Sequence, residues 1–492
     1  MRSLVAIALL AAVSLTAQVL TSQYDNARTG AILTETTLTP ANVNSAHFGK
    51  RFSLAVDGDL YGQPLFVPGL EIPGEGRHDV IFVATEHDSV YAFDAAGGPA
   101  EPLWKVNFLN ASAGVTTVPA QDVRCPFITP EIGITPTPVI DYESGTLYVL
   151  ARTKESKALT RPRFVQKLHA LAITTGAEKF GGPVEIKANG FDPLRELPRA
   201  GLLLDGGQLY LTWGSSCDAG PYHGWVMAYD AHTLRQTAVF NTSPDAEESG
   251  IWQSDNAPAA DGAGNIFVAT GNGKFDARAK GRDYGDSLLK LDRGLVVRDY
   301  FTPADESEMN RKDNDLGSGG PVLLPDHKLL IGGKDGRLFV VDRDHPGESV
   351  QSVRMLGGIY SAPAYWNGHV YVLARRDFLR DYKWEKGTLS KEPVTGKQTF
   401  ANSGATPAIS ANGTRNGIVW FIESKDWNGA DRPAVLHAFD ARDVTREIYS
   451  SEQVPNRDRA GMTLRFTIPT VANGRVYVNA KRKLEVYGLL GK

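Results

Sequence analysis

The feature that most limits how this chain can fold is a strand pattern that recurs along almost its whole length. Each copy has a small residue or glycine before a Pro-Val-like pair, then a turn, a strand such as GTLYVLA, and a strand ending in hydrophobic-x-Asp. The clearest copy reads GITPTPVIDYESGTLYVLA followed by KLHALAITTGAEKF. Alternating apolar residues in runs of about five, separated by Asp, Asn and Gly turns, are typical of short antiparallel strands.

The copies, including GIWQSDNAPAADGAGNIFVATGNG at residues 250–273, number about eight and follow one another at roughly 40–70 residues. This arrangement predicts a β-propeller with one sheet per copy. The last copy is one strand short, whereas segment 48–56, FGKRFSLAV, is a strand without a copy of its own. We expect it to pair with the C-terminal strands 475–479 and 484–487, which would close the ring and remove two sheet edges. The sequence therefore predicts an all-β fold, a single eight-bladed propeller, because no low-complexity linker divides the repeats.

Composition agrees with a large globular domain and excludes some functions. The chain has 492 residues, of which 42% are hydrophobic and 22% charged, and its 50 Gly and 28 Pro indicate many turns. A formal net charge of -4 lacks the basic excess that phosphate backbones require, so nucleic acid is not an expected partner. No GxSxG, HExxH or phosphate-loop pattern is present to support a hydrolase or nucleotide-binding function.

The N-terminus MRSLVAIALLAAVSLTAQ has the layout of a secretory signal, with one arginine, an apolar stretch and small residues ending at Ala17. The alternative is a buried N-terminal strand or helix. We expect a signal peptide at 1–17, an N-terminal extension at 18–47 and the propeller at 48–492. The protein would then be extracytoplasmic, periplasmic or secreted, without a membrane span, and a monomer.

Cys125 and Cys217 are the only cysteines. In an oxidising compartment two cysteines can form one disulfide, and the segments VRCPFI and GSSCDAG resemble loops that could meet. Two unpaired thiols are the alternative, because sequence does not supply the distance between them. A zinc site is disfavoured, since two isolated cysteines lack the paired spacing of zinc ligands.

The repeats resemble those of the quinoprotein dehydrogenases, which bind pyrroloquinoline quinone (PQQ), and of their PQQ-like relatives. The turn and the later aromatic residue of each copy are similar to that family's tryptophan-docking repeat. Trp104 retains the tryptophan, whereas aromatic residues of other types stand at Phe180, Phe240 and Tyr300. The resemblance covers most of the chain and implies a propeller of quinoprotein type, but not its chemistry.

Two stretches resemble the family's calcium and quinone-floor segments. WGSSCDAGPYHGWVMAYDAHT is similar to the segment with a calcium-binding glutamate, whose place falls on Ala219, next to Asp218. The stretch 250–273 resembles the segment that supplies a tryptophan floor under the quinone and a calcium-binding asparagine, and here Trp252 and Asn272 match. The resemblance implies PQQ and Ca²⁺ as cofactors, with Asn272 and Asp218 as candidate metal ligands.

Two further stretches resemble the segments that supply the reacting groups. IGGKDGRLFVVDRDHPGE places Lys334 where the family has a basic residue against the quinone oxygens, and FTPADESEMNRKDNDLGSGGPVLL places Asp313 or Asp315 as the catalytic base. The chain also departs from the family. It has no adjacent cysteine pair to cover the quinone and no Cys-x-x-Cys-His for an attached haem. The calcium site is short of one anionic ligand, because Ala219 replaces the glutamate.

Each of these residues has an alternative structural role. Trp252 could fill space between sheets, Asn272 could be an ordinary turn residue, and Lys334 and both aspartates could be exposed loop charges. Two functions follow. The first is a binding or scaffold propeller with a degenerate quinone pocket, which holds a small molecule, glycan or protein on its loop face. The second is a PQQ- and calcium-dependent dehydrogenase that oxidises an alcohol or sugar.

Overall fold

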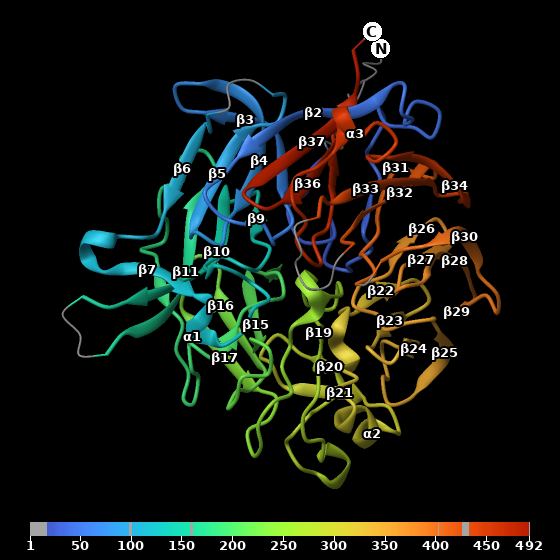
Figure 1. The fold of residues 1–492 in the computed structure, drawn as a ribbon. Coiled ribbons are helices and arrows are strands. Elements are labelled where there is room, and N and C mark those ends of the chain that lie inside the picture. The colour runs from blue at the N-terminus through green and yellow to red at the C-terminus, as the bar shows by residue number, and fades with distance from the viewer. Residues whose placement is uncertain (1–16, 98–100, 158–160, 402, 426–431, 492) are drawn as a thin grey trace, which may run out of the picture.

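Eight antiparallel sheets surround a common axis in the computed structural model of the protein, which describes residues 17–97, 101–157, 161–401, 403–425 and 432–491 (Figure 1). The predicted signal sequence lies almost entirely outside these residues. The first strands of neighbouring sheets contact one another, as β14 does with β9 and β18, so the first strand of each blade is innermost. The predicted all-β, eight-bladed propeller is confirmed.

Blades 1 to 4 follow in chain order, each written from its innermost strand outward. Blade 1 has β3 (Leu65–Ile72), β4 (Gly76–Ala84), β5 (Ser89–Asp94) and β6 (Trp104–Asn107), and blade 2 has β9 (Val139–Asp141), β10 (Thr146–Glu155), β11 (Arg163–Ala172) and β12 (Val184–Glu185). Blade 3 has β14 (Leu203–Asp205), β15 (Gln208–Ser215), β16 (Trp225–Asp230) and β17 (Gln236–Asn241). Blade 4 has β18 (Ala259–Ala260), β19 (Ile266–Ala269), β20 (Leu288–Leu291) and β21 (Val297–Phe301). Blade 2 gains β7 (Val115–Pro119) and β8 (Glu131–Ile132), and blade 3 gains β13 (Glu196–Leu197).

Blades 5 to 8 complete the ring. Blade 5 has β22 (Val322–Leu324), β23 (Lys328–Gly332), β24 (Arg337–Asp342) and β25 (Ser349–Arg354), and blade 6 has β26 (Ala364–Trp366), β27 (His369–Val372), β28 (Phe378–Glu385) and β30 (Val394–Thr399). Blade 7 has β31 (Ala408–Asn412), β32 (Arg415–Glu423), β33 (Val435–Asp440) and β34 (Asp443–Ser450). Blade 8 has β35 (Thr470–Ala472), β36 (Arg475–Ala480), β37 (Lys483–Leu489) and β2 (Phe48–Ala55). Blade 6 also has β29 (Thr388–Leu389), and β1 (Ala31–Ile32) pairs in parallel with β31.

The ring closes in blade 8, where the two ends of the chain share one sheet. β2 pairs antiparallel with β37, from Phe48 opposite Leu489 to Ala55 opposite Lys483, with one bulge. Figure 1 shows the blue β2 beside the red β37. The predicted closure by segment 48–56 is therefore confirmed, because β2 supplies the outermost strand that the last copy lacks.

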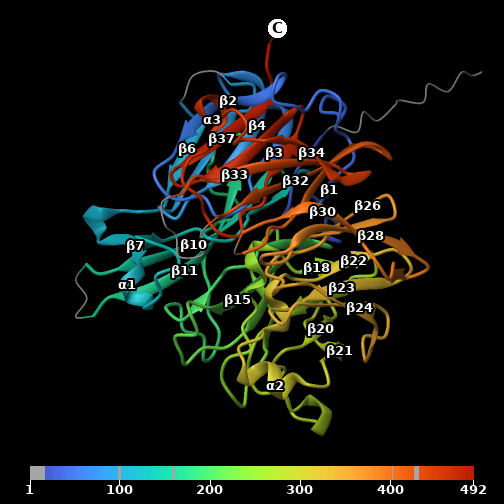
Figure 2. The ribbon, with the colours of Figure 1, turned by 45° about the vertical axis from the view of Figure 1, so that its right-hand side comes forward.

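Helices are few and short, and all lie in loops. They are α1 (Ala120–Val123), α2 (Glu306–Arg311) and α3 (Pro455–Asp458), with 3₁₀ turns η1 (Ala111–Ala113), η2 (Gln253–Asp255), η3 (Ala277–Ala279) and η4 (Leu316–Ser318). Within the described ranges, no helix combines the length and apolar character needed to cross a membrane. β7 and the outer ends of β10 and β11 extend beyond the rest of the ring, and α1 lies at their base (Figure 2).

Two tryptophans link neighbouring blades, one from the outermost strand β6 and one from the innermost strand β26. Trp104, the retained tryptophan, ends blade 1 and donates from Nε1 to the carbonyl oxygen of Ile173 in blade 2, at 2.9 Å. Trp366 of blade 6 bonds in the same way to Gly413 in blade 7, at 2.9 Å. An aromatic ring that is buried with its N–H paired links adjacent sheets without an unsatisfied polar group.

Candidate functional site

A cavity of about 360 Å³ opens on one face of the ring. Its walls come from loops that precede the innermost strands, such as those carrying Trp252 and Asp315, and from loops that join the second and third strands of a blade, such as that carrying Lys334. These loops emerge on the same face because the strands alternate in direction. The lining residues include Tyr61, Cys125, Phe127, Arg199, Cys217, Asp218, Trp252, Asp313, Asp315, Lys334, Tyr360, Arg465 and Phe466.

Lys334 is the centre of the polar part of this cavity. Its Nζ lies 2.6 Å from Asp315 Oδ2 and 2.7 Å from Asp313 Oδ1, and 5.5 Å from the centroid of the Trp252 ring. The side chain is only 14% exposed, so Lys334 is not an exposed turn charge. Burial alone would lower the pKa of Lys334, but the charges of Asp315 and Asp313 and their hydrogen bonds outweigh burial and raise it. The lysine therefore stays charged.

The two candidate aspartates differ in their surroundings. The Asp315 side chain is 9% exposed, and that of Asp313 is 67% exposed. Asp315 accepts hydrogen bonds from Trp252 Nε1 at 3.2 Å and from the Asn272 backbone N–H at 2.7 Å. Sequence left the choice between the aspartates open, and burial against Trp252 favours Asp315 as the group that meets a ligand.

Asn272 lies behind this pair. Its Nδ2 donates to Asp313 Oδ1 at 2.7 Å, while its Oδ1 is buried and has no hydrogen-bond partner. A buried acceptor without a partner carries a free-energy cost, and this atom is one of several of that kind among the described residues. Asn272 helps to position Asp313 and Asp315 through its hydrogen bonds, and it is not part of the cavity lining.

The residues present do not fit calcium well. Asp218 Oδ1 already accepts from Ser215 Oγ at 3.0 Å and from Tyr222 OH at 2.8 Å. Among the residues that the structure describes, no three His, Cys, Asp or Glu side chains lie together as a metal site would require. The Lys334 ammonium contacts both nearby aspartates and compensates one of their two negative charges, at the position where a hard cation would otherwise be needed.

The disulfide predicted from the cysteine pair is present between Cys125 and Cys217, with a Cα–Cα distance of 5.5 Å. It joins the loop after α1 to the loop after β15. Both cysteines line the same cavity as Trp252. The sequence has no adjacent cysteine pair. Instead, two cysteines that are 92 residues apart form a disulfide in the wall of the cavity.

Apart from Trp252, sequence reasoning missed the aromatic and arginine residues of the cavity. Trp252, Tyr360 and Phe466 form a cluster with ring centroids 6.2–6.3 Å apart. Arg199 lies 4.9 Å from the Tyr61 ring centroid, and Arg465 lies 4.1 Å from that of Phe127. A signal was available, because Tyr61, Tyr360 and Phe466 each stand three residues before the proline that precedes or opens an innermost strand: YGQP, YSAP and FTIP.

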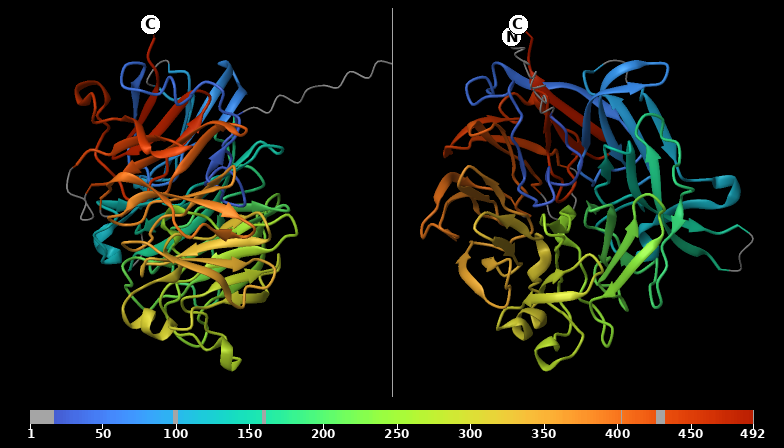
Figure 3. Two further views of the ribbon diagram at one scale, coloured as in Figure 1. Left: turned by 90° about the vertical axis from the view of Figure 1, so that its right-hand side faces the viewer. Right: turned by 180° about the vertical axis from the view of Figure 1, so that it is seen from behind.

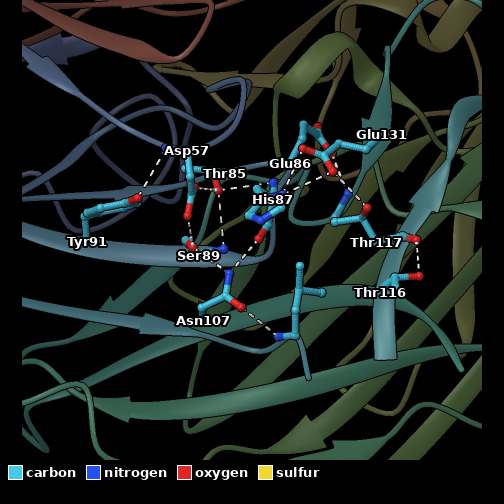
Figure 4. A network of polar contacts seen from close by, with 12 residues as sticks. Asp57, Thr85, Glu86, His87, Ser89, Tyr91, Asn107, Thr116, Thr117 and Glu131 are labelled. Carbon is cyan, nitrogen blue, oxygen red and sulfur yellow. Dashed lines mark hydrogen bonds and ion pairs between the residues drawn. The ribbon is translucent and has the colours of Figure 1, made fainter. Parts of the chain in front are cut away.

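A second polar network joins loops of blades 1 and 2 (Figure 4). Glu131 accepts from His87 Nδ1 at 3.0 Å and from Thr117 Oγ1 at 2.9 Å, while Asp57 accepts from Thr85 Oγ1 at 3.0 Å. The acids of this network are paired with side chains of neighbouring loops. These contacts indicate that the network helps to hold the loops around α1 in place.

Glu86, next to this network, is fully buried. Burial raises its pKa to about 7, against hydrogen bonds from Gly133 and Thr135 that lower it. Burial likewise raises the pKa of Glu196 in β13 to about 8. Both acids therefore release their protons at a higher pH than an exposed glutamate does.

Comparison with known proteins agrees with this fold. The chain is similar in structure to the quinohemoprotein alcohol dehydrogenase ADHIIG from Pseudomonas putida HK5, with a TM-score of 0.62, 14% identity, and coverage of 97% of this chain and 81% of that one. It is similar to a europium-containing methanol dehydrogenase, with a TM-score of 0.62, 12% identity, and coverage of 96% and 98%. BamB from Moraxella catarrhalis gives a TM-score of 0.51, 14% identity, and coverage of 90% and 97%.

No family model and no curated protein matches the sequence. At these identities the likeness concerns the fold, and the chain has the eight-bladed propeller of the PQQ-like repeat proteins, as its repeats predict.

Proposed function

We propose that this propeller is a binding module whose loop-face cavity holds a planar, anionic aromatic molecule of the PQQ type. The observation that carries the proposal is the buried Lys334, held between Asp315 and the Trp252 ring in a cavity that also contains a disulfide. Flat aromatic walls suit a flat ligand, and buried cations suit its carboxylate and quinone oxygens.

The lining contains three cations, those of Arg199, Lys334 and Arg465, and three carboxylates, those of Asp218, Asp313 and Asp315, so an anion would depend on the two arginines rather than on an excess of positive charge. Arg199 and Arg465 add two guanidinium groups to the Lys334 ammonium, and guanidinium pairs with carboxylates in a bidentate manner. Trp252 and Tyr360 would contact the ring system, and Lys334 its oxygens. When bound, such a quinone supplies two-electron acceptor chemistry. We propose that binding does not require calcium, because Lys334 already neutralises Asp315.

The dehydrogenase remains the second candidate, favoured by the position of Asp315. This carboxylate is buried within the cavity and held in place by Trp252 and Asn272. A carboxylate in that position could accept a proton from the hydroxyl group of an alcohol or sugar. Burial raises the pKa of Asp315 above its ordinary value, although the charge and hydrogen bond of Lys334 lower it, so the carboxylate would be a stronger base than an exposed aspartate.

The proposed compartment is extracytoplasmic. The disulfide supports an oxidising environment, and the proposed division into a signal at 1–17, an extension at 18–47 and a propeller body at 48–492 agrees with export. We propose a monomer, with a small molecule in the cavity as the main ligand and a glycan or protein as alternatives on the same face.

Equilibrium dialysis of the purified protein against PQQ tests the binding proposal. Lys334→Met should weaken binding at least tenfold, because it removes the cation nearest Trp252. Lys312→Met is the matched control, since Lys312 is 61% exposed and pairs with Glu308 on α2. Equal loss in both variants, or no binding to the unmodified protein, would contradict the proposal.

Reduction of an electron-accepting dye separates the two candidates. With PQQ bound and ethanol or glucose as substrate, the binding module should give no reduction above a protein-free control. Dye reduction that Asp315→Asn abolishes, while PQQ remains bound, would instead establish the dehydrogenase.

A further inference from the structure

The axis of the ring contains the protein's own N-terminal segment. Residues 19–32 enter the centre of the propeller between the innermost strands (Figure 3). Arg28 lies at the core of this segment and has no exposed surface. Its guanidinium donates to the carbonyl oxygens of Ser22 at 2.8 Å and of Pro258, which precedes β18, at 2.9 Å.

The segment makes a hydrogen bond to the innermost strand of every blade. Five backbone carbonyls, those of Leu20, Asn26, Ala27, Thr29 and Gly30, accept from blades 2, 4, 5, 6 and 7 at 2.7–2.8 Å, and Val19 exchanges two backbone bonds with blade 1. Asn26 Nδ2 donates to blade 3 at 2.9 Å, and Tyr24 OH accepts from blade 8 at 3.0 Å.

The blade partners occupy equivalent positions. Each is the second residue of its strand, and together they are Phe66, Ile140, Leu204, Ala260, Leu323, Tyr365, Ile409 and Val471. The eight blades therefore present one ring of backbone groups toward the axis. Because buried backbone groups must be paired, a propeller without this segment would leave that ring of donors and acceptors without protein partners.

We propose that the axis is a binding site for one turn-containing peptide, with residues 19–32 as its occupant, and that this occupant can be supplied as a separate peptide. The bonds are mainly to backbone, and they meet one strand in each blade rather than one continuous sheet edge. The site also supports the cavity above it, since the Gln23 backbone N–H donates to Gln63 Oε1 at 2.8 Å, two residues beyond Tyr61. The inference does not depend on which ligand the cavity takes.

A cut after the segment tests the proposal in the full chain. A protease recognition sequence inserted between Thr36 and Thr37, which are both exposed, allows the folded protein to be cleaved. The cleaved segment should stay bound through gel filtration and appear with the ring in native mass spectrometry, and an added labelled peptide 17–35 should replace it slowly. Loss of the segment on gel filtration with an unchanged melting temperature would overturn the proposal.

Gly30 provides a matched pair of variants. Gly30 has φ +71°, and a Cβ there would lie 3.0 Å from Ala364 Cβ and 3.2 Å from the Pro407 carbonyl oxygen. Gly74 has φ +84° in an exposed turn, and its Cβ would have no neighbour within 4 Å. Both alanine variants carry the same backbone strain, so only Gly30→Ala should release the cleaved segment at least tenfold faster.

Synthetic peptides make the same comparison if the Gly30→Ala chain does not fold. The peptide 17–35 with glycine at position 30 should displace the labelled peptide from the cleaved wild-type ring at least tenfold more effectively than the alanine peptide. Equal displacement by the two peptides, or none by either, would contradict a built axial site.

Discussion

Asp315 is held by three groups, Lys334, Trp252 and Asn272, and with Lys334 it forms an ion pair. The carboxylate is 9% exposed and lies 2.6 Å from the ammonium. Removing one partner of a buried ion pair leaves the other charge poorly compensated. We expect Asp315→Asn to lower the free energy of unfolding by about 2–3 kcal/mol, less than a fully buried pair would lose because Asp313 still contacts Lys334.

A double-mutant cycle with Lys334→Met, measured by urea unfolding, checks this expectation. The double variant should be more stable than the sum of the single losses predicts, by about 1–3 kcal/mol, because neither charge is then left alone. Additive losses would show that the two side chains do not depend on each other.

At the same scale, sequence identified the cavity residues that stand in stretches resembling the quinoprotein segments, and it missed the others. Trp252 and Lys334 lie in such stretches, so their positions in the repeat could be predicted. Arg199 and Arg465 lie in connections between blades, as Trp252 does, but in no such stretch, and tertiary packing rather than local pattern directs these connections toward the cavity. Their contribution could not be read from spacing alone.

At the scale of elements, closure of the ring depends on how β2 packs as well as on its pairing. Phe48 has no exposed surface, and its ring centroid lies 4.9 Å from that of Tyr449 and 5.5 Å from that of Trp420. Phe48→Ala should therefore lower the free energy of unfolding by about 3–5 kcal/mol. Phe52→Ala on the same strand should cost clearly less, because Phe52 is only half-buried.

Chemical denaturation followed by tryptophan fluorescence measures both variants. A single transition at lower urea for Phe48→Ala is expected if blade 8 holds the ring as one cooperative unit. Two separate transitions, or equal losses in the two variants, would contradict that role.

The strands themselves were predictable because period-two alternation and Asp/Asn/Gly turns are local properties. Closure by segment 48–56 was predictable as well, since one copy lacked a strand and one strand lacked a copy. The axial segment was not. Residues 19–32 contain only the two-residue strand β1, and their partners are distributed over eight blades, so no sequence periodicity marks the contact.

For the whole molecule, buried acids give stability a defined pH dependence. The folded-state pKa values of Glu86 and Glu196, about 7 and about 8, lie above the ordinary value of 4.5. Between pH 4.5 and each folded-state pKa, the folded chain holds protons that the unfolded chain releases. The stabilisation that these protons contribute is therefore largest at the low end of this pH range and is lost as pH rises through the folded-state pKa values. Each group contributes at most about 1.4 kcal/mol per pH unit.

Melting temperatures measured from pH 5 to pH 8.5 test this dependence. The wild-type protein should lose stability across the range, and the double variant Glu86→Gln/Glu196→Gln should lose less, because glutamine keeps acceptor atoms but cannot ionise. Glu101→Gln, at an exposed position, should leave the wild-type profile unchanged. A double variant with the wild-type profile would show that these acids do not govern it.

The central claim is that the cavity binds a PQQ-type quinone with Lys334, rather than a metal ion, as its main charge partner. The direct measurement is PQQ retained per chain after gel filtration, determined by absorbance, in excess calcium and in excess EDTA. We predict one quinone per chain in both conditions. Retention in calcium that EDTA abolishes, or no retention in either, would contradict the account.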